Sequence, residues 1–240
     1  MTHLAGALEA RLRVEGTAER ATGEKAYLKS ELEFLGATVW QIRTAVRELA
    51  PAMDHDTLVA TVADLWDSPV FERRLAAAFL LDRDAGEIGV GDLGFLERLI
   101  RESGTWALVD VLAGDVAGAI VVRDAPDASA VLDRWASDDD FWVRRASLLA
   151  ELAPIRAGHP LDRFLARAEA MLEEREFFIR KAIGWVLREA GKRRPDEVAA
   201  WLAPRTHRAS GVTMREAVKY LPAETAATLM EAYRAKRPAR

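Results

Sequence analysis

Two residues that are able to stabilise a positive charge, Trp106 and Asp110, stand four positions apart. The segment around them is rich in Leu, Val and Ala and follows a Ser-Gly-Thr triplet, so we predict a helix over residues 105–122. Residues four apart share one face of a helix. A carboxylate attracts a cation by its charge, and the face of an indole ring contributes about 0.5 to 2 kcal/mol. The pair therefore suits a reaction that develops positive charge.

Asp110 belongs to a series of charged residues at nearly constant spacing. Arg145, Arg180 and Arg215 follow it at intervals of 35 residues, and Arg73 precedes it by 37. A period of this length, with two helices per period, is typical of a stacked helical solenoid in which equivalent positions line up on one surface. We therefore predict an all-α solenoid whose concave surface carries this ladder of charged residues. A structural ion pair between neighbouring repeats is the alternative role for Asp110 and Arg145.

The segment 177–188 combines apolar residues at helical spacing with cationic residues on one side. Arg180, Gly184 and Arg188 lie four apart on one stripe of this predicted helix. A glycine within a helix costs about 1 kcal/mol relative to alanine. Its place between two arginines therefore indicates that another group approaches the backbone there, either a ligand or a tightly packed helix.

Length and composition indicate a single domain over residues 1–240. Half of the residues are hydrophobic, which is enough for a core, and the absence of cysteine excludes disulfides and thiolate chemistry. The four histidines are scattered without metal-ligand spacing, so we expect no metal and no cofactor. The N-terminus has no apolar signal region, and no apolar run approaches the roughly 18 residues of a membrane span. We expect a cytoplasmic protein without membrane contact.

The formal net charge of −4 is unevenly distributed along the chain. From Arg175 onward there are 15 Lys and Arg against 7 Asp and Glu, a charge of +8, whereas the acidic part over residues 1–174 stands at −12. A basic surface on an otherwise acidic protein is typical of polyanion binding. Solvated charge on Ala- and Arg-rich helices is the alternative interpretation.

Several motifs, in order along the chain, resemble those of the AlkD-type DNA alkylation repair glycosylases. They are Trp106-x-x-x-Asp110, Phe141-Trp142-Val143-Arg144-Arg145-Ala146, the segment Phe177–Arg188 and Met214-Arg215-Glu216-Ala217. Weaker similarity over residues 27–36 and 65–72 extends the resemblance to most of the chain. The family consists of HEAT-like solenoids, so the resemblance implies HEAT-like repeats with a concave DNA-binding surface.

By this resemblance the chain is a DNA glycosylase that hydrolyses the N-glycosidic bond of alkylated purines in double-stranded DNA. Asp110 is then the catalytic carboxylate, Trp106 and Trp185 flank the deoxyribose of the lesion, and Arg145 serves the same site. The residues expected to contact DNA are Tyr27, Arg144, Arg180, Lys181, Arg188 and Arg215. Because the ladder carries no histidine or second acid to protonate a leaving base, we expect excision of cationic N3- or N7-alkylated purines. We expect a monomer that is associated with the nucleoid through DNA.

Two other classes of protein fit the same sequence. One is a non-catalytic HEAT-repeat protein that binds damaged or branched DNA, and the other is a protein-interaction scaffold. The basic part over residues 175–240 suits either DNA function, and the acidic part suits the scaffold. Of the seven tryptophans, four are expected to be packing residues: Trp40, Trp66, Trp135 and Trp201.

Overall fold

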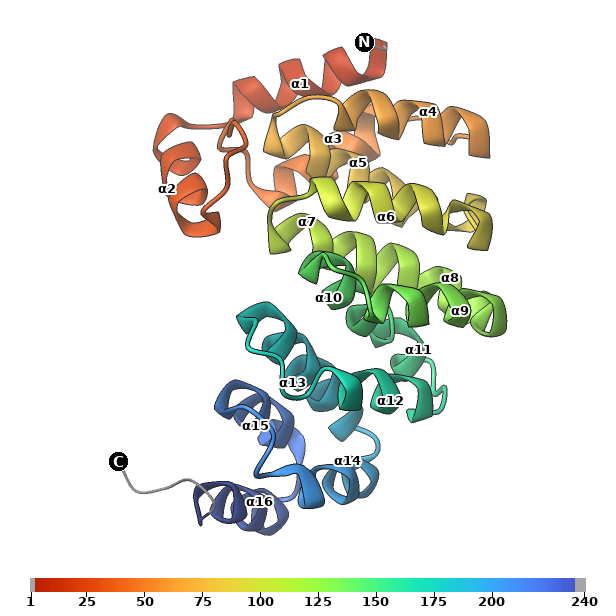
Figure 1. Ribbon diagram of the computed structural model, residues 1–240. Coiled ribbons are helices and arrows are strands. Elements are labelled where there is room, and N and C mark those ends of the chain that lie inside the picture. The colour runs from red at the N-terminus through yellow and green to blue at the C-terminus, as the bar shows by residue number, and fades with distance from the viewer. Residues whose placement is uncertain (1–2, 236–240) are drawn as a thin grey trace. The chain divides into compact units, whose positions relative to one another are not determined.

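The computed structural model describes residues 3–235, and every regular element in that range is helical (Figure 1). The one strand-like feature found there is an isolated parallel bridge between Glu33 and Val70. The predicted all-α class is therefore confirmed. Contacts divide the chain into two compact units, Met1–Ile120 and Val121–Arg240, whereas a single domain over 1–240 stays a prediction. None of the helices within 3–235 is both long and apolar enough to cross a membrane.

The first unit is a succession of short helices around an apolar core in which Leu8, Leu65 and Trp66 are fully buried. Its α-helices are α1 (His3–Glu15), α2 (Ala18–Leu28), α3 (Val39–Leu49), α4 (His55–Trp66), α5 (Phe71–Arg83), α6 (Leu93–Glu102) and α7 (Trp106–Asp110). A π-helical segment, Val111–Ala117, follows α7, and α8 (Gly118–Arg123) spans the boundary between the units in sequence.

The second unit repeats the pattern of short helices. Its elements are α9 (Ala125–Ala136), α10 (Phe141–Leu149), α11 (Leu152–Arg156), α12 (Asp162–Ala170), α13 (Phe177–Gly191), α14 (Pro195–Leu202), α15 (Gly211–Ala217) and α16 (Ala223–Ala235). Helix α13 packs against α10 on one side of the sequence and against α15 on the other. These three helices carry the ladder residues Arg145, Arg180 and Arg215, respectively for α10, α13 and α15.

Side-chain hydrogen bonds between successive repeats show the period directly. In the second unit, Lys181 pairs with Glu216 and Arg194 donates to the His159 carbonyl, each across 35 residues. In the first unit, His55 bonds to Asp92 across 37 residues. These separations match the ladder intervals, so the helical-repeat fold is confirmed. The concave DNA-binding surface of the whole chain stays a prediction.

A buried carboxylate positions the segment between α2 and α3. Glu72 is fully buried, and its Oε1 and Oε2 accept hydrogen bonds from the backbone N–H groups of Leu35, Gly36 and Ala37 at 2.6–3.3 Å. Burial raises the pKa of Glu72, and these N–H donors oppose that rise. Gly36 has φ = 81°, and a Cβ there would lie 2.1 Å from the Thr17 carbonyl oxygen. Glycine and Glu72 together thus fix how α2 joins the unit.

Helix ends set by local side chains follow the sequence closely. Thr38 forms a capping box with Gln41 at the start of α3, Asp54 caps α4, and Asp140 caps α10 by accepting from the Trp142 N–H at 2.8 Å. The residue pattern between 4 and 34 predicts helices over 4–21 and 24–34, and these bounds are wrong. Helix α1 ends at Glu15. The next residue, Gly16, passes so close to the Leu35 carbonyl oxygen that a Cβ there would lie 2.1 Å from it. Helix α2 instead runs through Gly23 to Leu28.

The tryptophans expected to pack divide into two groups. Trp66 and Trp135 are fully buried, as predicted. Trp40 is 72% exposed, so its predicted packing role is wrong, because α3 buries the opposite face with Ile42, Ala45 and Val46. Trp201 is half-buried, and the Arg205 guanidinium lies 4.7 Å from the centroid of its ring.

Gly184 lies where α13 and α15 touch most closely. A Cβ at this position would lie 2.7 Å from the Glu216 Cβ and 3.0 Å from the Thr213 carbonyl oxygen. Of the two groups that the sequence allowed near this glycine, the structure therefore shows the packed helix.

Substitution Gly184→Ala is expected to destabilise the protein by about 1–3 kcal/mol, because the added methyl group overpacks this helix contact. Gly94→Ala in α6 is the matched control, since no atom lies within 4 Å of a Cβ there. The control should be neutral or stabilise by up to about 1 kcal/mol through helix propensity. Urea unfolding measures both changes, and equal stability of the two variants would contradict the packing argument.

Candidate active site

Trp106 and Asp110 are the first and last residues of α7, a helix of five residues. Thr105 precedes the helix as its N-cap, after Gly104 at φ = 59°. Both Trp106 and Asp110 are half-buried. The residue after Asp110 begins the π-helical segment Val111–Ala117. Such π-helical turns are rare and often occur at functional sites, and this one begins directly after Asp110.

Tyr27 joins Trp106 on the first unit. Their ring centroids are 6.0 Å apart and the rings meet edge to face at 86°. Tyr27 comes from the end of α2, the helix positioned by Gly36 and Glu72, and remains 73% exposed. The sequence predicted separate roles for Trp106 and Tyr27, and the structure brings these two residues together.

A largely apolar cavity of about 300 Å³ opens beside this pair of rings. The Arg43 guanidinium lies 3.8 Å from the centroid of the Phe79 ring and 3.1 Å from an Asp82 carboxylate oxygen. The cavity is lined by Glu24, Tyr27, Leu28, Val39, Arg43, Phe71, Leu75, Phe79, Trp106, Ala107 and Val111. Across residues 3–235, no three His, Cys, Asp or Glu side chains gather so as to hold a metal ion.

Arg145 is buried in the second unit, with 3% of its surface exposed. Its Nη1 donates to the Phe178 carbonyl oxygen at 2.6 Å, and its guanidinium carbon lies 5.7 Å from the centroid of the Phe178 ring. Trp185 lies two turns further along α13 and is half-buried. Arg145 on α10 is thus hydrogen-bonded to α13, the helix that carries Trp185. The catalytic roles of both residues stay predictions.

The basic residues expected to contact DNA differ in what already holds them. Arg144 pairs with Glu174 at 2.9 Å, and Lys181 pairs with Glu216 at 2.6 Å. Arg188 also pairs with Glu216, and the Arg180 Nε donates to the Glu174 carbonyl oxygen at 2.6 Å. Arg215, in contrast, is exposed and has no ion pair within residues 3–235.

Glu216 is the centre of the cationic group on α13 and α15. Burial raises its pKa, but Lys181, Lys219 and Arg188 outweigh burial, so the pKa is lowered overall. A DNA phosphate would compete with this carboxylate for Lys181 and Arg188. Arg215 has no such carboxylate competitor within residues 3–235, and its contact with DNA stays a prediction.

An aromatic cluster that the sequence reasoning did not assign lies at the N-terminal ends of α10 and α13. The Trp142 ring centroid is 4.4 Å from that of Phe141 and 4.8 Å from that of Phe178. Phe177 contacts Phe178 edge to face at 5.4 Å and is 53% exposed. The signal was present in the sequence, since two adjacent aromatic residues start each of the two helices, one repeat apart.

Comparison with known proteins decides the family. The sequence profile described as DNA alkylation repair enzyme matches residues 8–221, most of the chain. The chain belongs to the DNA alkylation repair enzyme family. The family resemblance predicted from the motifs is thereby confirmed. No curated protein sequence matches the chain.

Solved structures with the same fold include one that is described as a DNA alkylation repair enzyme. A structure described as a predicted DNA alkylation repair enzyme from Enterococcus faecalis is 21% identical with a TM-score of 0.77, over 87% of this chain and 98% of that one. AlkD2 from Streptococcus mutans is 18% identical with a TM-score of 0.61, over 86% and 100%. The smu.31 protein from Streptococcus mutans UA159 is 17% identical with a TM-score of 0.60, over 88% and 100%. Because all three sequence identities are below 25%, these similarities show that the chain has the same fold and nothing more.

Proposed function

We propose that this family member is a monofunctional DNA glycosylase that excises cationic N3- and N7-alkylated purines. The observation that carries the proposal is the arrangement on α7, where the Asp110 carboxylate follows the Trp106 indole by one helical turn and the π-helical segment begins directly after it. An exposed aromatic partner, Tyr27, and an apolar cavity adjoin the indole. A carboxylate and an indole face are the groups that a developing sugar cation requires.

The reaction breaks the bond between C1′ of the deoxyribose and the purine nitrogen. The bonding electron pair leaves with the base, which neutralises the positive charge of the alkylated ring, and the sugar becomes an oxocarbenium ion. Asp110 stabilises this ion by its charge and orients a water molecule. The water oxygen then bonds to C1′ and Asp110 accepts the proton. The products are the free alkylpurine and an abasic site.

The side chains around Asp110 have separate tasks in this proposal. Trp106 presents its ring to the cationic sugar, and Tyr27, edge to face with Trp106, fixes the orientation of that ring. The apolar cavity adjoins the Trp106 ring. Trp185 and Arg145 are proposed, from the family resemblance, to act on the same lesion.

DNA binding in the proposal depends on the basic residues of α13 and α15, and Arg215 gives the sharpest test. Each phosphate contact lowers the slope of log affinity against log salt by about 0.9 for duplex DNA. Arg215→Ala should therefore make the slope less negative by about 0.9 when duplex binding is titrated between low and physiological salt. Arg98→Ala in α6 is the control, because Arg98 is also exposed but pairs with Glu102 in the acidic part of the chain. An unchanged slope for Arg215→Ala would show that Arg215 does not contact a DNA phosphate.

Product analysis tests the proposed activity itself. Duplex DNA carrying 7-methylguanine is incubated with the protein, and both the released base and the resulting abasic sites are quantified. The proposal predicts equal amounts of free 7-methylguanine and alkali-labile sites, with no strand break before alkali. Tight duplex binding without base release would instead support the non-catalytic DNA-binding function.

A further inference from the structure

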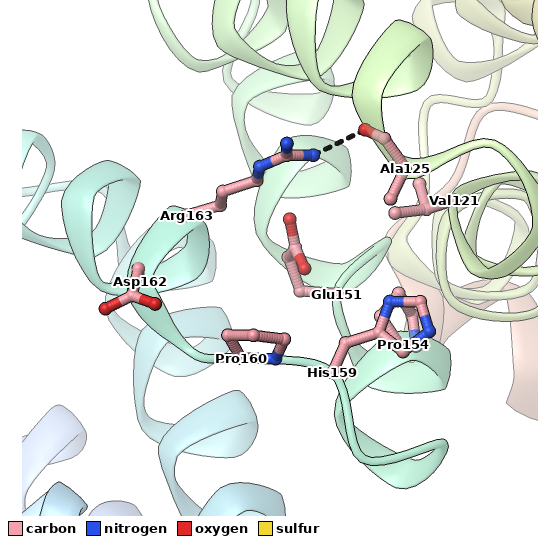
Figure 2. A pocket seen from close by; sticks show the side chains of 8 residues that line it. All are labelled: Val121, Ala125, Glu151, Pro154, His159, Pro160, Asp162 and Arg163. Atoms are coloured by element: carbon pink, nitrogen blue, oxygen red, sulfur yellow. Dashed lines mark hydrogen bonds between the residues drawn. The ribbon is translucent and has the colours of Figure 1, made fainter.

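A second cavity, of about 270 Å³, lies within the second unit and shares no lining residue with the aromatic cavity of the first. Figure 2 shows its walls, which come from α8, the start of α9, α11 with the residue before it, and the loop that leads into α12 with the first residues of that helix. Pro154, Pro160 and Val121 supply apolar surface. The volume is near the lower end of the range for small-molecule sites, so it suits a compact ligand.

A buried carboxylate points into this cavity (Figure 2). Glu151 is only 3% exposed, and its Oε1 accepts a hydrogen bond from Arg167 Nη1. Its other oxygen, Oε2, accepts none from any residue between 3 and 235. This oxygen is therefore accessible from the cavity and available to an N–H or O–H donor of a bound molecule.

A hydrogen-bond donor lies on the opposite side of the same cavity. Arg163 Nη1 donates to the Ala125 carbonyl at 2.5 Å and to Ser129 Oγ at 2.6 Å, which anchors the guanidinium. Its Nε and Nη2 have no partner in the part of the chain that the structure describes. These groups are available to a carbonyl oxygen of a ligand.

Groups of both charge signs line the cavity. They are the carboxylates of Glu151 and Asp162, the guanidinium of Arg163 and the imidazole of His159. Arg167, outside the lining, pairs with both Glu151 and Asp133. Because a charged ligand would meet a lining group of its own sign, the cavity favours a neutral molecule with both a donor and an acceptor.

We propose that this cavity binds a small, neutral, planar heterocycle in which an N–H group adjoins a carbonyl group, the edge found on free nucleobases of the uracil and hypoxanthine type. The N–H donates to Glu151 Oε2, the carbonyl accepts from Arg163, and the ring lies against Pro154 and Pro160. The site is independent of the proposed glycosylase activity, since its ligand binds without DNA.

Isothermal titration of the full chain with uracil, hypoxanthine and 1,3-dimethyluracil tests the proposal. Uracil and hypoxanthine are expected to bind with a dissociation constant in the millimolar range or tighter. 1,3-Dimethyluracil has no N–H donor and should bind at least tenfold more weakly. Benzamidine and benzoate, as planar ions, should also bind at least tenfold more weakly than uracil.

Two variants locate the binding. Ala125→Phe fills the cavity and should abolish binding, whereas Ala130→Phe on the exposed side of the same helix should leave it unchanged. Glu151→Gln keeps an acceptor for Arg167 but turns an amide NH₂ toward the cavity. This variant should bind uracil at least tenfold more weakly than the wild-type protein. Circular dichroism checks that each variant folds.

Four results would overturn the proposal: no binding of uracil or hypoxanthine to the wild-type protein, equal binding of the dimethylated base, tighter binding of either ion, or full binding by folded Ala125→Phe. Should Ala125→Phe not fold, unchanged uracil binding by Glu151→Gln would overturn it equally.

Discussion

Asp110→Asn is expected to lower the single-turnover rate of 7-methylguanine release by about 10²–10³-fold, because asparagine keeps the shape of the side chain but removes the charge that stabilises the sugar cation. Asparagine is also unable to accept the proton of the attacking water. Binding of the damaged duplex should change little, since the loss falls on the transition state. Rapid-quench measurement of base release under saturating enzyme separates these two effects.

Asp115→Asn provides the matched control for this experiment. Asp115 lies in the π-helical segment one turn beyond Asp110, and it is exposed, whereas Asp110 is half-buried. The control variant should retain nearly the wild-type rate. Equal rates for the wild type and Asp110→Asn would remove Asp110 from the mechanism, and equal losses in both variants would point to a general effect on the helix.

The second large effect concerns the leaving group. A cationic 7-methylguanine or 3-methyladenine leaves as a neutral base, whereas ethenoadenine must first be protonated. General acid catalysis contributes about 10²–10⁴-fold where it operates, and the predicted ladder carries no histidine or second acid to supply it. We therefore expect excision of ethenoadenine to be at least about 10²-fold slower than that of 7-methylguanine from otherwise identical duplexes.

Measuring the affinity of the protein for each duplex separates differences in binding from differences in bond breaking. If both duplexes bind with similar dissociation constants, the difference in single-turnover rate reports the bond-breaking step alone. Preferential cutting of the neutral lesion would contradict the leaving-group argument. It would also require a proton donor that the ladder does not contain.

The sequence predicted those parts of the fold that depend on neighbouring residues. Thr38 is predictable as the cap of α3 because its side chain reaches an N–H group three positions on. For α4 the sequence allows Asp54 or Asp56, and for α10 any residue of Asp138–Asp140; the structure selects Asp54 and Asp140. The 35-residue ladder is likewise visible in the chain, because each repeat needs similar residues at similar places. The break at Gly16 was missed because it depends on Leu35, which local helix patterns do not include.

The candidate site was predictable in its residue types but not in its contacts. Trp106 and Asp110 follow from spacing on one helix, whereas the edge-to-face contact of Trp106 with Tyr27 joins residues on separate helices. The pairing of Lys181 and Arg188 with Glu216 also joins residues that are distant in the sequence. Because of this pairing, a phosphate would have to compete with the Glu216 carboxylate for both side chains. Gly184 shows the same limit, since its close neighbour is also Glu216.

The central claim is that the Asp110 carboxylate and the Trp106 indole stabilise a cationic sugar. Binding of duplexes that carry either a cationic pyrrolidine or a neutral tetrahydrofuran in place of one deoxyribose tests it most directly, because the cation resembles the transition state and the neutral ring does not. The wild-type protein is predicted to bind the pyrrolidine duplex more tightly, by tenfold or more, and Asp110→Asn to lose most of that preference. Equal binding of the two duplexes by the wild-type protein, or a preference that survives in Asp110→Asn, would contradict the claim.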